Sequence, residues 1–180
     1  MQRNVNLMIK KIFLLLLIYF LLFLSYLGAS KHIPMQFSSE IIIKQSIDKT
    51  IALWKDKNNY QYWQDGFISK ELISGTKDGK GAVSIIKLKQ GNGEMELKET
   101  VMSSNLATEF NVLIEHQHMS NTMNNHFIAI DENTTLWKTE INYFKVNFWP
   151  AKVMMRLFPN MFKKQGKKWW NQFKDFAEKQ

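Results

Sequence analysis

The chain has 180 residues, a formal net charge of +8 and no cysteine. The lack of cysteine excludes a disulfide framework. The residues that follow position 30 suffice for one domain with a full core and are too few to favour two.

The first thirty residues form a hydrophobic N-terminal segment. Three basic residues precede an uncharged apolar run from Ile12 to Ala29. A helix needs about 20 apolar residues to cross the hydrocarbon core of a bilayer, and this run lies at the short end of that range. We therefore expect residues 1–30 to be a transmembrane anchor (a signal-anchor) and residues 31–180 to be one domain.

Removal of this segment as a secretory signal is the alternative. Gly28–Ser30 offers small residues for a cleavage site, but the apolar run continues through Leu27, beyond a usual signal core. The basic residues Arg3, Lys10 and Lys11 lie on the N-terminal flank, which predicts a cytoplasmic N-terminus. The domain would then face outward, into a periplasm or extracellular space. The protein would be a single-pass membrane protein if the segment is retained, and secreted if it is cleaved.

The positive charge of the domain is concentrated near its end. Residues 31–149 carry 13 basic and 14 acidic residues, whereas residues 150–180 carry eight basic and two acidic ones. This segment could be a solvated helix face, or it could attract anionic lipid headgroups. Its lysines and tryptophans could also bind nucleic acid. We expect no nucleic-acid partner, because an exported domain would rarely meet one.

The domain begins with a predicted strand and two short helices. Phe37–Lys44 is a β-branched run that is typical of a strand. Ser46 can cap a helix in which apolar residues recur with helical spacing as far as Trp54. Tyr60–Trp63 indicates a second helical turn.

Closely spaced turn signals then predict an antiparallel meander. Asn92-Gly93 is a type I′ hairpin signal. Gly75–Gly81 is another turn, because its glycine spacing does not fit a phosphate-binding Walker loop. A polar, asparagine-rich loop is expected before Phe127. The predicted strands are Ser84–Lys89, Glu94–Val101, Ala107–Glu115, Phe127–Ile130 and Leu136–Phe144.

The predicted strands alternate apolar and polar side chains, as in a sheet that is covered on one side. The C-terminal segment predicts the cover. Pro150 suits the first turn of a helix, and Pro159 ends or kinks that helix. A longer amphipathic helix follows, from about Asn160 to Lys179.

This order of elements resembles the helix-grip fold of the SRPBCC superfamily, which includes START-like, Bet v 1-like and polyketide cyclase/dehydrase and lipid-transport proteins. Ile43–Trp54 followed by Tyr60–Trp63 looks like the family's opening. Asn133–Trp137 is similar to its last turn and strand, and Trp169–Lys174 looks like its closing helix. The resemblance covers roughly residues 36 to 179. Membrane-tethered bacterial members with one leading helix also look like this layout.

The resemblance implies an α+β fold in which a curved antiparallel sheet of about seven strands wraps a long C-terminal helix. It also implies an apolar cavity between them for a lipid, an isoprenoid-like molecule or another hydrophobic molecule. Ten methionines and many aromatic residues fit such an interior, although the same residues would also fill a plain core. The residues expected to line the cavity are Trp63, Phe67, Leu97, Glu99, Phe110, Val112, Trp137, Ile141, Tyr143, Phe158, Phe162, Trp170 and Phe173.

Glu99 is the main candidate for chemistry. Strand alternation places it on the apolar face, where it could orient a polar head group or act as an acid or base. A strand end or a bulge could instead turn it to solvent, and we favour this alternative. His116, His118 and His126 flank the polar loop without a cysteine or an inward acid, so we expect no metal site. No serine lies in a nucleophile elbow, and we assign no catalytic residue and no cofactor.

Three functions stay open, because a fold alone does not choose among them. The first is a non-enzymatic, membrane-anchored binding module for a hydrophobic small molecule. The second is a cyclase- or hydrolase-like enzyme with Glu99 or Tyr143 as its acid or base. The third is an interaction protein with a filled core that acts through its basic C-terminal helix. We expect the first, which requires only buried apolar area and one or two polar anchors.

Overall fold

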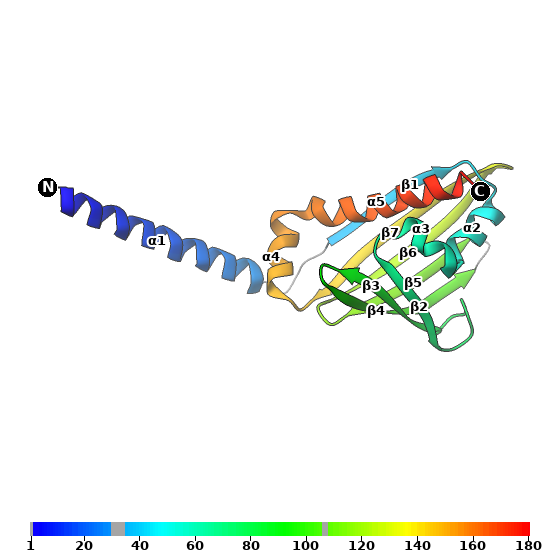
Figure 1. Cartoon of the computed structure of the whole chain (residues 1–180), viewed down its shortest axis with the longest axis horizontal. Coiled ribbons are helices and arrows are strands. Elements are labelled where there is room, and N and C mark those ends of the chain that lie inside the picture. The colour runs from blue at the N-terminus through cyan, green and yellow to red at the C-terminus, as the bar shows by residue number, and fades with distance from the viewer. Residues whose placement is uncertain (1, 30–34, 106–107) are drawn as a thin grey trace.

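The computed structural model describes residues 2–29, 35–105 and 108–180. A long helix, α1, extends away from a domain that is built from one sheet and several helices (Figure 1). The elements are α1 (Gln2–Ala29), β1 (Met35–Ile43), α2 (Ile47–Lys55), the 3-10 turn η1 (Lys57–Asn59), α3 (Tyr60–Trp63), β2 (Phe67–Ser74), β3 (Val83–Gln90), β4 (Gly93–Asn105), β5 (Glu109–His116), β6 (Met119–Asp131), β7 (Thr134–Val146), α4 (Trp149–Leu157) and α5 (Pro159–Ala177).

The seven strands form one antiparallel sheet in the order β1-β7-β6-β5-β4-β3-β2. Strands β2 to β7 pair in sequence as a meander, and β1 pairs with β7, so that Met35 lies opposite Tyr143. The register shifts between Val101 and Ser103 in β4 and again in β6. Such bulges bend a strand and increase its twist. The sheet and α5 confirm the predicted helix-grip α+β fold.

Helix α5 lies against the sheet because its apolar side chains fall on one face. Trp170, Phe173 and Ala177 are buried, at the spacing of successive helical turns. Gly166 lies where the helix approaches β1 closely: an added Cβ would sit 3.2 Å from the Trp170 ring and 3.4 Å from the Phe37 ring. The absence of a side chain at this glycine therefore lets α5 pack close to β1.

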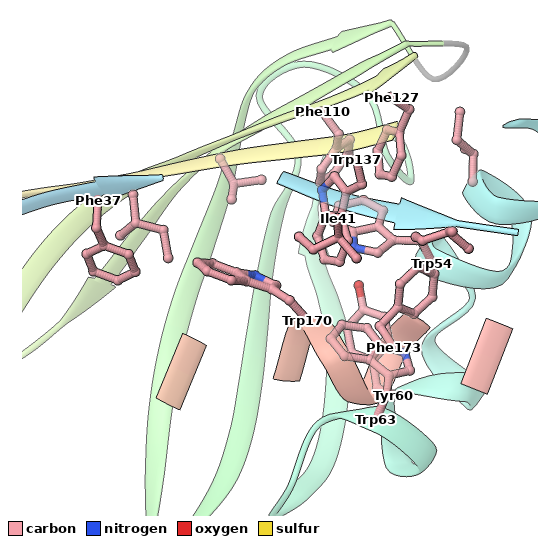
Figure 2. Packing of buried hydrophobic residues seen from close by; sticks show 14 of the residues in the cluster. Phe37, Ile41, Trp54, Tyr60, Trp63, Phe110, Phe127, Trp137, Trp170 and Phe173 are labelled. Carbon is pink, nitrogen blue, oxygen red and sulfur yellow. The ribbon is translucent and has the colours of Figure 1, made fainter. Parts of the chain in front are cut away.

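An aromatic cluster fills the domain around α2 and the middle of β7 (Figure 2). The Trp54 ring packs edge-on against Phe110 and Phe127, each with ring centres 5.4 Å apart. Trp137 packs edge-on against Trp54 at 6.1 Å and against Phe173 at 5.4 Å. These rings form a packed core in this half of the domain.

The predicted asparagine-rich loop before Phe127 is wrong, because β6 already begins at Met119. Asparagine disfavours strands, but here the side chain of Asn125 bonds within the sheet. The fully buried Asn125 donates from Nδ2 to the Phe110 carbonyl oxygen at 3.0 Å, and its Oδ1 accepts from Trp137 Nε1 at 3.1 Å. Partners that are distant in sequence therefore override the local preference.

The β3–β4 turn and the start of α2 differ in detail from what the sequence predicts. The hairpin between β3 and β4 is confirmed, but its loop is Gly91-Asn92 rather than Asn92-Gly93. Only Gly91 of this loop has a positive φ, 58°, which fits a type II′ turn rather than type I′. Ser46 is the N-cap residue of α2, but its side chain makes no capping hydrogen bond. Pro150 lies in the first turn of α4 as expected, and α4 ends before Pro159, which is the first residue of α5.

Candidate ligand-binding cavity

A cavity of about 710 Å³ lies between the sheet and helices α3, α4 and α5. Strand alternation supplies its sheet side, for example through Leu97 on β4, Val112 on β5 and Ile141 on β7. Its volume falls in the range of about 300–1,000 Å³ that is typical of small-molecule pockets. The domain is therefore packed at the aromatic cluster and hollow beside it.

The cavity opens at the end of the domain beside α4. The residues that line it and are also exposed lie there: Gln90 before the β3–β4 turn, Phe148 before α4, Met154 on α4, and Met161 and Gln165 on α5. The aromatic cluster closes the opposite end. In Figure 1 the C-terminal end of α1 lies beside α4, so the opening is close to the apolar helix.

Most of the predicted cavity residues line this space. Phe67, Phe158 and Phe173 do not. Phe67 packs beneath α3, Phe173 is fully buried between two tryptophans, and Phe158 is half-exposed at the junction of α4 and α5. The predicted residues that line the cavity are Trp63, Leu97, Glu99, Phe110, Val112, Trp137, Ile141, Tyr143, Phe162 and Trp170.

Glu99 is the one acidic residue of the cavity wall among the residues that the structure describes. It is 7% exposed, so the bulge-to-solvent alternative is wrong. Its Oε1 lies 2.9 Å from Nζ of Lys70 on the edge strand β2, and this Nζ also donates to the Tyr60 hydroxyl at 3.3 Å. A buried carboxylate is costly without a partner, and Lys70 supplies the countercharge.

Burial and charge together set the protonation of this cluster. Burial raises the pKa of the Tyr60 hydroxyl above its ordinary value, against an opposing effect of Lys70. Burial alone would lower the pKa of Lys70, but Tyr60 and Glu99 outweigh it and raise that pKa. Burial also raises the pKa of Tyr143. At neutral pH Lys70 is therefore charged, and both phenols keep their protons.

Two of the three candidate histidines lie at the opening of the cavity. His116 and His118 have ring centres 5.1 Å apart, and His118 stacks on Phe148 at 4.7 Å. Burial, and then His118, lower the pKa of His116. His126 pairs with Glu109 at the other end of β5, so the structure does not bring the three imidazoles together.

The sequence interpretation missed Lys70 and Tyr60 in this site. Lys70 lies in a mostly exposed edge strand, where no local pattern distinguishes it from a surface lysine. Tyr60 had a signal in the aromatic turn Tyr60–Trp63, from which only Trp63 was assigned to the cavity. Met154 and Met161 at the opening were also missed, although both are among the apolar residues of their amphipathic helices.

No protein-family model and no curated protein matches the sequence. Solved structures do share its fold. The aromatase/cyclase Zhui from Streptomyces sp. R1128 superposes with a TM-score of 0.63 at 11% identity, over 81% of this chain and 94% of that one. Norcoclaurine synthase from Thalictrum flavum, in complex with dopamine and hydroxybenzaldehyde, gives 0.58 at 12% identity, over 81% and 87%.

A START superfamily protein from Mycobacterium smegmatis superposes with a TM-score of 0.54 at 10% identity, over 74% of this chain and 96% of that one. Identities this low bear on the fold and not on the activity. The chain therefore has the helix-grip fold of these structures.

Proposed function

We propose that this protein is a membrane-anchored binding module that holds a hydrophobic small molecule, a lipid or an isoprenoid-like compound, between the sheet and α5. The observation that carries the proposal is the cavity of about 710 Å³, whose lining is predominantly apolar and aromatic. Apolar surface that leaves water gains roughly 25 cal/mol per Å², so such a lining favours an apolar occupant. The norcoclaurine synthase complex is an example of small aromatic molecules bound to this fold.

Glu99 supplies a polar anchor in this proposal. Its carboxylate lies in the cavity wall and is held by Lys70 through Oε1. An ionised carboxylate has several acceptor positions, so it can keep this ion pair and accept a hydrogen bond from a ligand. We infer that the bound molecule is largely apolar and carries one hydroxyl or amine donor.

The anchor in this proposal is α1. Its segment Met8–Tyr26 has a mean hydropathy of 2.2, and none of it is buried against the domain. The basic residues Arg3, Lys10 and Lys11, at the N-terminal end of α1, favour a cytoplasmic N-terminus and an outward-facing domain at residues 31–180. Secretion of the domain after cleavage of a signal is the alternative.

The test is recovery of the ligand from the full-length protein. Native mass spectrometry of the detergent-extracted chain, followed by lipid extraction, should identify a bound hydrophobic molecule. Ile114 lines the cavity, so Ile114→Trp should fill it and remove the bound mass. Leu113→Trp, on the opposite face of the same strand, is the matched control and should retain it. An unchanged ligand load in a folded Ile114→Trp variant would contradict the proposal.

An enzyme on the same fold is the second candidate, and the proton-carrying groups of the cavity favour it. Glu99, Tyr60 and Tyr143 all line the same space. Glu99→Gln keeps the shape of the side chain but removes its capacity to accept a proton. If the wild-type chain converts its extracted ligand to a product and Glu99→Gln binds without conversion, the enzyme interpretation replaces the binding module.

A further inference from the structure

We propose that α4 and the first turn of α5 form a second membrane contact around the opening of the cavity, so that the cavity faces the lipid of an anionic bilayer. The inference rests on the proposed anchoring by α1 and adds an orientation for the domain. The mouth surface is defined here by Phe148, Trp149, Leu157, Phe158 and Met161.

The mouth surface exposes large apolar side chains within a short stretch of chain. Trp149 is 57% exposed, Phe158 50% and Met161 56%, with α1 already in place. Contiguous apolar patches on a soluble protein usually mark a binding surface. Tryptophan and other aromatic residues are favoured where a protein meets the interface between lipid and water.

The charge of this region matches an anionic lipid surface. Residues 141–174 contain eight basic residues and no acidic residue. Lys152 lies on α4, and Lys163 and Lys164 follow Met161 on α5. Helices that combine exposed apolar and basic side chains lie in the plane of an anionic bilayer surface. Each lysine near such a surface strengthens binding roughly fivefold.

The position of α1 brings this region to the bilayer. Helix α1 packs against α4, and its C-terminal end lies beside α4 in Figure 1. Within Met8–Tyr26, Leu24 near that end is half-buried, while the other residues are exposed. If α1 spans the membrane, its end reaches the outer surface, and α4 lies at the depth of the headgroups.

The mouth surface and the cavity share residues. Phe148 and Met161 are exposed and also line the cavity, as does Met154 between them. An apolar molecule can therefore pass from the acyl region into the cavity along apolar side chains, without crossing water. A second copy of this chain fits the same surface poorly, because two patches of like charge repel.

The experiment uses the full chain in vesicles of phosphatidylcholine and phosphatidylglycerol that contain brominated lipids. The chain has no cysteine, so Leu157→Cys can carry a single environment-sensitive fluorophore. Ile130→Cys is the control, because the exposure of Ile130 (53%) is similar to that of Leu157 (44%). Ile130 lies near the end of β6, beside the start of β7, whereas α4 follows the other end of β7. We expect quenching by the lipid at position 157 and not at 130. The double variant with Lys163→Gln and Lys164→Gln should weaken the quenching at position 157.

Each other outcome has a distinct meaning. If the labelled chain floats with the vesicles and position 157 is not quenched, this inference is overturned and the α1 anchor survives. If the chain does not float, both fail. Equal quenching at positions 157 and 130 overturns the proposed orientation. Disulfide-linked dimers of the unlabelled Leu157→Cys variant, with no lipid quenching of the labelled variant, would assign the mouth surface to a second copy instead.

Discussion

The Glu99 carboxylate and the Lys70 ammonium reach each other across β3, from β4 and β2. Both side chains are largely buried, with 10% and 13% of their surfaces exposed. Glu99→Leu would leave Lys70 charged without its carboxylate partner, so we expect a loss of about 3 kcal/mol in the free energy of unfolding. Lys70→Met should cost a similar amount, because it leaves the carboxylate unpaired.

The double variant, Lys70→Met with Glu99→Leu, should recover most of that loss, since two apolar groups replace the pair. Urea unfolding of all four proteins measures the coupling. Simple addition of the two single losses would mean that the ion pair does not form.

The same cluster predicts a loss of stability in alkaline solution. The pKa values of Tyr60 and Lys70 are both raised in the folded state, so that state keeps protons that the unfolded chain releases. Their contribution is complete below the ordinary tyrosine pKa of 10.0 and is lost as the pH rises through the folded pKa. Tyr60→Phe should flatten this decline in unfolding experiments over that range. The exposed Tyr62→Phe is the control and should leave the decline unchanged.

The sequence predicts the direction of Glu99 but not its partner. Alternation with Leu97 and Val101 was enough to place the carboxylate on the cavity face. The position of Lys70 depends on the register of β2 against β3, which shifts near both ends of their pairing. No local pattern encodes that register.

Helix α5 packs against the filled core at one position and borders the cavity at another. Phe173 is fully buried against Trp63 and Trp137, whereas Phe162 lines the cavity. Phe173→Ala should cost about 4 kcal/mol, because it opens a void in a packed core. Phe162→Ala should cost about 1 kcal/mol, because it enlarges a space that already exists. Thermal or urea unfolding compares the two, and equal losses would show that the region of Phe162 is filled.

Elements with a strong periodic pattern could be predicted, and elements held by long-range bonds could not. The apolar run of α1 and the amphipathic pattern of α5 each identify a helix without reference to other elements. Strand β6 has no such pattern between Met119 and Asn125, and the bonds of the Asn125 side chain to β5 and β7 involve residues distant in sequence. The volume between the sheet and α5 also depends on side-chain packing, for example at Gly166, and the periodicity of the sequence does not predict it.

For the whole molecule, the proposed topology predicts which ends of the chain are accessible from outside the cell. A membrane-impermeant maleimide should label Lys179→Cys in intact cells, because the domain faces outward. It should label Asn6→Cys only after permeabilisation. The absence of native cysteine removes background labelling. Labelling of Asn6→Cys alone in intact cells would reverse the orientation, and loss of residues 1–30 from the mature mass would establish secretion.

The aromatic rings around Trp54 and Trp137 stop the cavity at one end, while its exposed lining lies at the other. A long, narrow molecule that enters by the open end must leave by the same end. The end that goes in first is therefore the last to emerge. Under the proposed function, such a molecule keeps one fixed polarity throughout its stay, with its trailing end always toward α4.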